Sequence, residues 1–434
     1  MTVTDPFADD AKLTPFWWDD VPRPSLPATQ PPAKADVVVV GSGYTGLAAA
    51  LQTARGGRHT VVLDAEDAGF GCSTRNGGQI STSIKPGYHA LARRFGAERA
   101  FRIVQEGRNS LAWAGAFVTD EGIDCDFRTC GRFHAAHNPA RYEALARMLT
   151  AQPKDLQIAA HMVPRAEQAG ELGTDVYCGG IVYEHHASVH PARFHQRLLD
   201  RVLQAGATVI PHCPATAIHR AGAGFRIDCA GASIAARNVV VATNGYTGRL
   251  VPWLRRRVIP IGSYIIATEP IPAPTMARLM PRDRVISDTR KVVYYYRPSP
   301  DGRRILFGGR VSYNETDPRR SGPPLHAEMA RIFPDLADTR ISHSWAGFVA
   351  YTFDEMMHVG ERDGLFYAMG YCGSGVGMAG YLGTRIGQQV LGRPEGATAL
   401  DNLPFESRPY YWGNPWFLAP SVAYYRWRDR SMRT

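Results

Sequence analysis

The sequence lacks the features of a membrane or secreted protein. No apolar run approaches the ~18 residues that a transmembrane helix needs. The first 20 residues contain no basic segment followed by an apolar one, so we expect no signal peptide and a cytoplasmic protein.

Cysteine is scarce and irregularly placed. The chain of 434 residues has seven cysteines, an odd number, and none forms a CxxC pair. A disulfide framework or a zinc site would need paired or closer spacing, so we expect neither, and we predict no metal site. The cysteines are Cys72, Cys125, Cys130, Cys178, Cys213, Cys229 and Cys372.

Lysine is nearly absent, supplying five of the 49 basic residues, and the formal net charge is +9. Arginines form short clusters such as 255–257, without a run of ~5–8 basic residues or a nucleic-acid motif. We interpret these clusters as solvated faces, predict no nucleic-acid or membrane partner, and leave the oligomeric state open. Hydrophobic residues (44 %) and charged residues (21 %) are balanced as in folded globular proteins.

What is present begins with a βαβ pattern. Residues 1–35 are rich in proline and read as an extended lead-in with no element of its own. Residues 36–40 are a β-branched run, typical of a strand buried on both faces of a parallel sheet. A helix is predicted over 47–55 and a second strand over 60–63.

The turn inside this pattern carries Gly41-x-Gly43-x-x-Gly46. Gly41 permits a tight turn, Gly43 lets the backbone approach a pyrophosphate, and Gly46 lets the helix pack closely on the strand. Tyr44 and Asp64 follow, the latter where a carboxylate takes ribose hydroxyls. The pattern predicts a dinucleotide site, and the lack of a basic neighbour beside Asp64 disfavours NADP.

A second glycine-rich segment, residues 69–79, bears on the choice between FAD and NAD. Gly77 and Gly78 would let the main chain press against a flat isoalloxazine ring, and nearby N–H groups would favour its reduction. Taken alone, the same residues fit an ordinary surface loop equally well.

Strands and helices alternate along the rest of the chain. We expect helices over 193–204 and 379–391, a buried strand over 238–242, and a hairpin of strands 291–297 and 304–308. The alternation predicts an α/β (α+β) fold. A Rossmann-like nucleotide-binding domain is assembled from separated segments, with a strand-rich domain inserted between them.

The segment GFGCSTRNGG at 69–78, with GYCGSGVG at 370–377, is far more specific than the first glycine motif. These motifs resemble the FAD-dependent amine and amino-acid oxidase superfamily of D-amino-acid oxidase, glycine oxidase and sarcosine oxidase. Within it the likeness is to gamma-glutamylputrescine oxidase-like members. The stretches that carry the resemblance are 35–79, 188–270, 294–310, 345–383 and 414–418.

The resemblance implies non-covalent FAD and the architecture of glycine oxidase and D-amino-acid oxidase. The implied parts are an extended lead-in (1–35), an FAD-binding domain (36–84, 178–247 and 342–398), an inserted strand-rich substrate-binding domain (85–177 and 248–341) and a C-terminal tail packed on the FAD domain (399–434).

The resemblance also implies which residues contact FAD, including a second helix whose amino terminus faces the flavin O2 edge. The implied contacts are Gly41, Gly43, Tyr44, Thr45, Gly46, Asp64, Ala65, Gly71, Cys72, Ser73, Arg75, Asn76, Gly77, Gly78, Ala217, Ala242, Thr243, Asn244, Gly245, Gly370, Gly373, Ser374, Gly375, Val376, Gly377 and Met378.

On the substrate side, the residues implied to be catalytic are Tyr295, Arg310 and Ser374. Those implied to contact substrate are Tyr264, Tyr294, Tyr296 and Trp345. Period-two alternation places Tyr295 on one strand face and its two neighbours on the other. The alternative, that all three tyrosines simply pack a half-buried sheet, stays open.

The sequence also departs from the family pattern. Val349 and Gly373 stand where glycine and D-amino-acid oxidases hold the α-carboxylate of the substrate with arginine, which disfavours a simple α-amino acid. Leu306 stands where sarcosine oxidase has a lysine, so oxidase and dehydrogenase both stay open, with oxidase favoured.

The function implied is FAD-dependent oxidation of the C–N bond of a primary or secondary amine, such as gamma-glutamylputrescine or another carboxylated amine. A hydride would pass to flavin N5, and the imine would hydrolyse to an aldehyde and an amine or ammonia. The electron acceptor would be O2, giving H2O2, or another acceptor. The alternatives are an amino-acid or N-methyl-amino-acid oxidase or dehydrogenase and, more distantly, an RNA-modifying flavoprotein.

Overall fold

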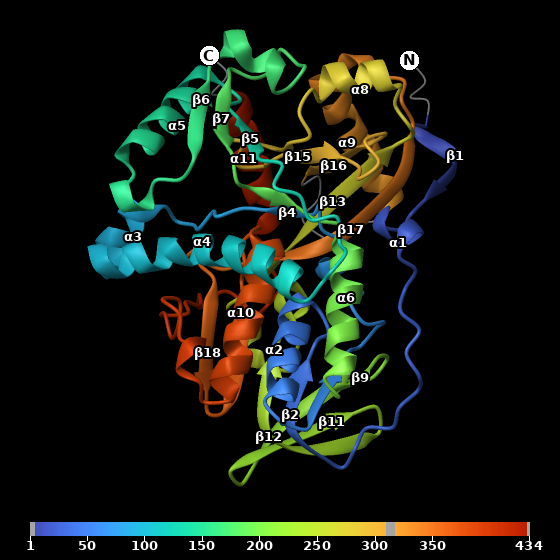
Figure 1. Cartoon of the computed structure of the whole chain (residues 1–434), viewed down its shortest axis with the longest axis vertical. Helices are drawn as coiled ribbons and strands as arrows, with labels where there is room; N and C mark the ends of the chain where they lie inside the picture. Colours follow the sequence, from blue (N-terminus) through green and yellow to red (C-terminus); the bar gives the residue numbers. More distant parts are fainter. Residues whose placement is uncertain (1–4, 310–316, 432–434) are drawn as a thin grey trace.

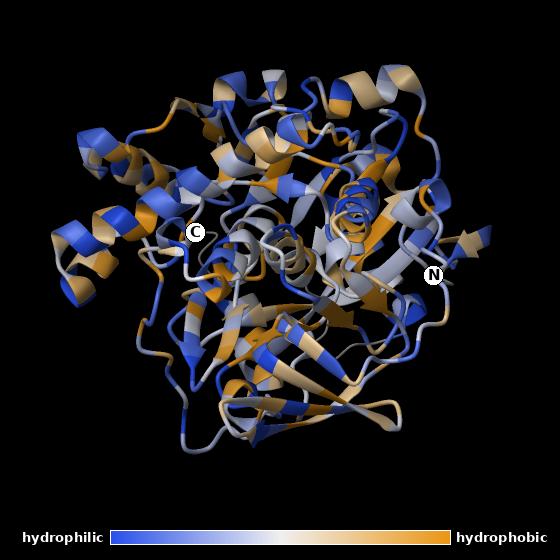
Figure 2. Ribbon diagram, turned by 60° about the horizontal axis from the view of Figure 1, so that its bottom comes forward, coloured by the Kyte–Doolittle hydropathy of each residue, from blue (hydrophilic) through white to orange (hydrophobic). Residues whose placement is uncertain are grey.

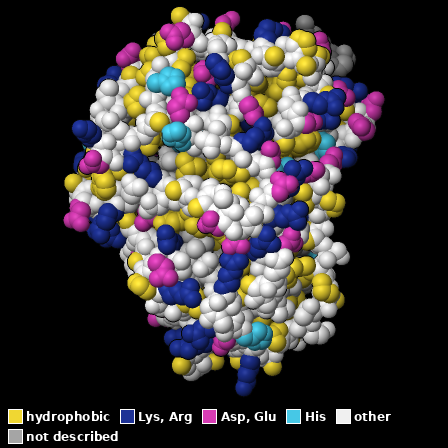
Figure 3. Space-filling view, viewed as in Figure 1, with side chains coloured by type: hydrophobic (Ala, Val, Ile, Leu, Met, Phe, Trp, Pro, Cys, Tyr) yellow, Lys and Arg dark blue, Asp and Glu magenta, His cyan; other side chains and the backbone are white. Residues whose placement is uncertain are grey.

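The computed structural model describes residues 5–309 and 317–431. Its elements gather around two large sheets, one in the lower and one in the upper half of the view in Figure 1. No helix in these ranges is both long enough and apolar enough to cross a bilayer. On the face seen in Figure 3, Lys and Arg side chains are interspersed with Asp and Glu, as expected for solvated faces.

The lower sheet is built on the βαβ pattern. Val37, Val38 and Val39 are fully buried, because their strand, β2 (Lys34–Val40), has parallel neighbours on both sides and is covered on both faces. The strand order is β10 (Ala215–Ala221), β11 (Gly224–Cys229), β12 (Ala232–Val241), β2 (Lys34–Val40), β3 (Thr60–Leu63) and β9 (Thr208–Ile210), with β19 (Leu365–Met369) beside β12 and β18 (His358–Arg362) beside β19.

Small residues let the helices of this half pack closely. A Cβ on Gly383 of α10 would lie 2.3 Å from the Thr45 carbonyl oxygen of α2, so the two helices cross at a distance only glycine allows. Figure 1 shows α2, α6 and α10 side by side along the sheet. The helices of this half are α2 (Tyr44–Arg55), α3 (Tyr88–Phe95), α4 (Ala97–Asp120), α6 (Pro191–Gln204) and α10 (Gly375–Val390).

The upper sheet has nine strands and its own core, in which Phe133, Phe307 and Phe333 are fully buried. Figure 2 shows hydrophobic residues concentrated on the central strands. The order is β1 (Phe7–Lys12), β17 (Ile341–Tyr351), β13 (Ile259–Thr268), β16 (Ile305–Gly309), β15 (Tyr295–Pro298), β14 (Val285–Asp288), β5 (Arg132–Ala135), β7 (Gly180–Tyr183) and β6 (Ala160–Val163). The remaining helices are α1 (Trp17–Asp20), α5 (Pro139–Ala151), α7 (Pro252–Arg255), α8 (Ala273–Leu279), α9 (Pro318–Ile332) and α11 (Leu418–Ser431), and β4 (Gln79–Ile80) pairs with β8 (Ala187–Ser188).

Most predicted elements are confirmed, with shifted ends. The predicted helix at 379–391 begins earlier, at Gly375. The predicted strand at 291–297 begins later, at Tyr295, because the N–H groups of Lys291 and Val292 donate to Asp429 of α11 and not to a neighbouring strand. The 238–242 strand is the end of the longer β12.

The proline-rich lead-in does contain elements, so that expectation is wrong. β1 runs parallel to β17, and the Ile341 N–H donates to the Pro6 carbonyl. The short helix α1 follows, with Trp17 fully buried. β1 is stabilised by pairing with a segment more than 300 positions away in the sequence. No local sequence pattern predicts such a pairing.

Several elements cross the predicted domain bounds. β7 and β17 lie within segments assigned to the FAD-binding domain, yet both pair in the nine-stranded sheet. α4, assigned to the substrate domain, packs against α10. Through Asp429, the C-terminal tail also reaches the loop before β15. Segments assigned to each predicted domain therefore contribute to both halves, and the domain bounds stay a prediction.

Candidate functional site

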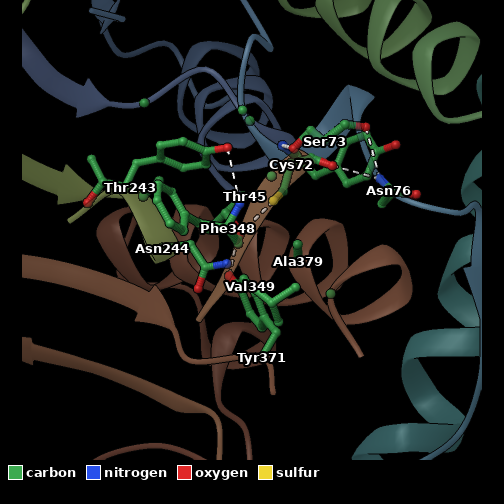
Figure 4. A pocket seen from close by; sticks show the side chains of 18 of the residues that line it. Thr45, Cys72, Ser73, Asn76, Thr243, Asn244, Phe348, Val349, Tyr371 and Ala379 are labelled. Atoms are coloured by element: carbon green, nitrogen blue, oxygen red, sulfur yellow. Dashed lines mark hydrogen bonds between the residues drawn. The ribbon is translucent and has the colours of Figure 1, made fainter. Parts of the chain in front are cut away.

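A cavity of about 720 Å³ lies between the two sheets. Val40 and Val241, at the carboxyl ends of β2 and β12, line one side of it. Ser263 and Tyr295 of the nine-stranded sheet line the other. Figure 4 shows many of the lining side chains. The volume falls within the roughly 300–1,000 Å³ of small-molecule and cofactor sites, at the sheet edge where such ligands bind in open α/β folds.

The backbone of the first glycine turn adopts a conformation that residues with a side chain would disfavour or clash with. Gly41 has a φ of +101°, and a Cβ on Gly46 would lie 1.8 Å from the Gly41 carbonyl oxygen. The turn therefore leads directly into α2, whose N-cap is Gly43. Gly43, Tyr44 and the next residue line the cavity, so the positive end of the helix faces it.

Asp64 is held by the same turn. Its Oδ2 accepts a hydrogen bond from the Ser42 N–H at 2.8 Å and another from the Ser42 hydroxyl. Asp64 and Ala65 both line the cavity beside the turn. This is the position that a ribose-binding carboxylate requires, and the role stays a prediction.

The second helix amino terminus, that of α10, also meets the cavity. Residues 373–376 line it, and the Thr45 hydroxyl lies 2.6 Å from the Tyr371 hydroxyl, which joins the starts of α2 and α10. Two helix amino termini directed at one cavity favour a ligand that carries negative charge at two places.

Two strained residues border this junction. Asn244 and Cys372 line the cavity with φ values of +41° and +50°. The Asn244 side-chain oxygen accepts from the Gly370 N–H at 3.0 Å, and the Cys372 N–H donates to the Ala350 carbonyl at 3.0 Å. Strained backbone that its surroundings hold in this way concentrates at ligand sites. Burial raises the pKa of the Cys372 thiol to about 11, so it is protonated at neutral pH.

Residues 69–79, the glycine loop, form the wall between the two helix termini and the upper sheet. Two buried indoles hold the loop. Trp17 Nε1 donates to the Asn76 carbonyl at 2.8 Å, and Trp345 Nε1 donates to the Arg75 carbonyl at 2.9 Å. The indoles satisfy these carbonyls and fix the path of the main chain that borders the cavity.

The end of the glycine loop is clamped by a buried arginine. Arg297 Nη1 donates to the carbonyls of Val189, at 3.0 Å, and Gly78, at 3.4 Å. Burial lowers the pKa of Arg297 to about 10, which leaves it charged at neutral pH. Gly78 has a φ of +67°, and a Cβ there would lie 2.1 Å from the Val189 carbonyl oxygen. Gly78 therefore shapes the loop.

Trp17→Phe should weaken cofactor binding. Phenylalanine keeps the apolar ring but leaves the Asn76 carbonyl without its donor, at a cost of about 1–2 kcal/mol. We expect the dissociation constant for FAD, measured by fluorescence on reconstituted protein, to rise about 5- to 30-fold. Trp253→Phe is the control, because that indole packs on Tyr367 and Phe405. Equal effects of the two changes would contradict the proposed role of Trp17.

Tyr295 is the central residue of the cavity wall on the upper sheet. Its hydroxyl lies 2.8 Å from Ser263 Oγ, and its ring passes over β16, where a Cβ on Gly308 would lie 2.3 Å from it. Its ring also lies beside Gly77, where a Cβ would be 3.2 Å away. Gly308 therefore sets the position of the ring.

Gly308→Ala should displace this ring into the cavity. Because small misplacements of a wall next to reacting groups cost about 10- to 100-fold in rate, we expect kcat/KM for an amine substrate to fall by that factor. FAD content should not change. Gly170→Ala, at an open position with no atom within 4 Å, is the control. An unchanged kcat/KM in the Gly308 variant would show that the Tyr295 ring does not border the substrate.

Three predicted substrate contacts lie in or against the core on the opposite face of the sheet. Tyr264 and Tyr296 are fully buried in the upper core. The rings of Tyr294 and Tyr296 stack on Phe307 at centroid distances of 5.5 and 5.3 Å. The alternation is thus confirmed: Tyr295 lines the cavity, and its neighbours do not. Trp345, also fully buried, supports the glycine loop from behind.

Two of the three residues predicted to be catalytic line the cavity. Tyr295 and Ser374 line the cavity, and the Ser374 hydroxyl donates to the Ser83 carbonyl at 2.9 Å. Arg310 lies outside the described residues. The catalytic roles of all three stay predictions.

Most residues predicted to contact FAD line the cavity. These are Gly41, Gly43, Tyr44, Thr45, Asp64, Ala65, Gly71, Cys72, Ser73, Arg75, Asn76, Gly77, Ala242, Thr243, Asn244, Gly373, Ser374, Gly375 and Val376. The residues that do not line it are Gly46, Gly78, Ala217, Gly245, Gly370, Gly377 and Met378. Gly46 and Gly78 shape turns from behind, and the neighbours Ala215 and Thr216 line the cavity in place of Ala217.

The sequence reasoning missed several polar lining residues, Gln79, Ser83 and Arg249 among them. Arg132, Ser263, Ser287 and Lys85 also line the cavity, and Ser263 and Ser287 lie beside Tyr295. Arg132 Nε donates to Ser287 Oγ at 2.8 Å, in the pair of strands β5 and β14. The alternation of polar and apolar residues in Arg132-Phe-His-Ala could have indicated a half-buried strand. Only its pairing with strands far away in the sequence shows which face borders the cavity.

The cavity fits FAD. Two helix termini suit the diphosphate and the polar edge of a flavin, Asp64 suits a ribose, and the glycine loop offers main chain to a flat ring. Cys72 Sγ donates to the Phe348 carbonyl at 2.6 Å, as a packed thiol does, and the non-covalent attachment of FAD stays a prediction. Within the described residues, no group of three His, Cys, Asp or Glu side chains is placed to hold a metal.

Fold and site together define a flavin-dependent oxidoreductase with a strand-rich half over the cofactor cavity. Comparison with protein families agrees, because residues 36–389 match the model of the DAO family, FAD-dependent oxidoreductases. The chain belongs to this family, and its cofactor is FAD.

Similar proteins span nearly the same length. The chain is 31 % identical over 416 residues to the oxidoreductase OrdL of Rhizobium meliloti, covering 94 % of this chain and 95 % of that one. It is 30 % identical over 406 residues to gamma-glutamylputrescine oxidoreductase of Escherichia coli, covering 91 % and 93 %. Glycine oxidase of Geobacillus kaustophilus has a similar fold, with a TM-score of 0.73 at 20 % identity over 87 % of this chain and all of that one.

Proposed function

We propose that the protein oxidises the C–N bond of a primary or secondary amine that also bears a carboxylate, with gamma-glutamylputrescine as the model substrate. The imine formed would be hydrolysed to an aldehyde and ammonia or a smaller amine. With O2 as acceptor, the second product would be hydrogen peroxide. When bound, FAD supplies the acceptor for the hydride that leaves the carbon next to nitrogen.

One observation carries the choice of an amine over a simple α-amino acid. Val349 and Gly373, which stand where the family resemblance places carboxylate-binding arginines, both line the cavity. Neither side chain can pair with an α-carboxylate. The likeness to gamma-glutamylputrescine oxidoreductase, at 30 % identity, supports the same choice.

The chain's own residues would act by position and charge. The Tyr295 ring and its Ser263 partner would confine the amine next to Gly77. The amino terminus of α10 would stabilise negative charge that develops on the cofactor side of the cavity. No residue here has to act as a strong base, because an amine that binds uncharged can lose a hydride directly.

The test is anaerobic titration of the FAD-loaded protein with gamma-glutamylputrescine, putrescine, sarcosine and glycine, followed by visible absorbance. We expect gamma-glutamylputrescine to bleach the flavin fastest and, in air, to release peroxide. Bleaching by glycine or sarcosine alone would favour an amino-acid or N-methyl-amino-acid oxidase. Bleaching without peroxide in air would identify a dehydrogenase.

A further inference from the structure

One cation that lines the cavity, Arg132, forms no ion pair with a carboxylate among the described residues. Arg132 of β5 lines the cavity on the upper-sheet side, and burial lowers the pKa of its guanidinium. The only carboxylates among the described lining residues are those of Asp64 and Glu66, both beside the first glycine turn.

Neutral groups orient this guanidinium. Arg132 Nε donates to Ser287 Oγ at 2.8 Å, and Arg132 Nη2 lies near the same oxygen and 3.3 Å from His134 Nδ1. His134 Nδ1 in turn lies 2.8 Å from Ser287 Oγ. Burial first, and then the charge of Arg132, hold the pKa of His134 well below its ordinary value, so the imidazole is neutral. Among the described residues, none accepts from Arg132 Nη1.

Two other enclosed arginines are paired with carboxylates. Arg290 pairs with Asp288, and Arg284 pairs with Glu171. Arg297 has no carboxylate partner: two main-chain carbonyls accept from its Nη1, and its buried Nη2 has no partner among the described residues. Burying a cation without a carboxylate partner is costly unless a ligand supplies a negative charge.

We propose that Arg132, oriented by Ser287 and His134, binds the carboxylate of the substrate at the end remote from the reacting nitrogen. This inference rests on the proposed function and narrows its substrate class. Lys85, an exposed residue that also lines the cavity, adds a second positive charge. Together the two cations favour an anionic group there.

The sheet sets the distance between the Arg132 guanidinium and the Tyr295 ring. The Arg132 guanidinium lies at Ser287 of β14, and the Tyr295 ring lies over Gly308 of β16. These two strands lie on either side of β15, so two strand spacings separate the groups. At about 4.8 Å between strands, the separation is roughly 10 Å. An α-amino acid, whose carboxylate and nitrogen share one carbon, is too short for both positions. An amine joined to its carboxylate by a chain of several atoms spans them.

The test measures binding without turnover, on FAD-loaded protein by calorimetry. The probes are N-butylglutaramate, a carboxylate with no oxidisable amine, and its neutral match N-butylglutaramide. We expect wild type to bind the acid at least about tenfold more tightly than the amide. Arg132→Met should abolish this preference. Arg102→Met, which removes an exposed arginine of α4, should keep it.

Each outcome decides the proposal. Equal binding of acid and amide by wild type, or an undiminished preference in Arg132→Met, overturns it. If Arg132→Met does not fold, Arg132→Lys keeps the charge and loses the planar fork, and acid binding that weakens by less than about threefold overturns it. Flavin bleaching by amines is scored separately. A preserved acid preference without bleaching would reject the proposed function and leave this subsite standing.

Discussion

Gly46→Ala should leave the protein unable to retain FAD. The added Cβ would lie 1.8 Å from the Gly41 carbonyl oxygen and 3.2 Å from a methyl group of Val39. The main chain of the turn or the start of α2 must move to make room, and both border the cavity. Overpacking of this kind costs about 1–3 kcal/mol in folding stability. The larger effect is on the cofactor, since the displaced groups are the N–H donors of the helix terminus.

The measurements are the FAD-to-protein ratio after purification and the free energy of unfolding of the apoprotein. We expect a ratio near zero and a stability loss of about 1–3 kcal/mol. Gly115→Ala is the matched control. It lies within α4, where the nearest atom to a Cβ would be 3.8 Å away, so alanine should be neutral or stabilise by about 0.5–1 kcal/mol. Full FAD content in Gly46→Ala would show that this contact does not fix the turn.

The cofactor half of the site could be predicted because its signals are local. β2, the glycine turn, α2 and β3 follow one another within residues 34–63, and each has a distinct pattern of valine, glycine or alanine. Their geometry follows from the order alone, since a parallel βαβ unit has one favoured hand. Asp64 could be placed at the sheet edge for the same reason.

The substrate half depends on pairings between distant segments, and only part of it could be predicted. Alternation along β15 separated Tyr295 from its neighbours correctly, because the period of a strand is fixed. It could not bring Arg132 beside Ser287, since β5 and β14 are more than 100 residues apart and meet only in the folded sheet. For the same reason Tyr264, which lies on β13, was placed at the cavity and belongs to the core.

The two tryptophans that hold the glycine loop could not be predicted from the composition of the segments around them. Trp17 lies in a stretch rich in proline and Trp345 in a buried strand, and neither pattern predicts that their indoles donate to neighbouring carbonyls of one loop. Such contacts make a loop of flexible composition into a fixed wall, because each buried carbonyl needs a donor. A cofactor site on such a loop is therefore defined by distant residues as much as by its own glycines.

Mild acid should destabilise the protein before most of its carboxylates are protonated. Burial lowers the pKa of His186 to about 3, and of His190 and His195 to about 4 each. In the unfolded chain each would titrate near its ordinary value of about 6.5. Below that pH these histidines bind protons in the unfolded chain but stay neutral in the folded chain. Stability is therefore complete above about pH 6.5 and falls as the pH drops toward 4, by up to ~1.4 kcal/mol per pH unit for each histidine.

His195→Gln isolates one of these groups. His195 Nε2 donates to the Ser42 carbonyl at 2.8 Å, within the first glycine turn, and an amide N–H of glutamine can replace that donor without titrating. Between pH 7.5 and pH 5.0 we expect the variant to lose about 2 kcal/mol less unfolding free energy than wild type, measured by urea titration at both values. His89→Gln, at an exposed position of α3, should lose as much unfolding free energy as wild type.

Identical acid sensitivity of His195→Gln and wild type would mean that the His195 imidazole titrates alike in the folded and unfolded chain. The turn under the cofactor would then be open to solvent, contrary to the packing of the His195 ring against Gly69.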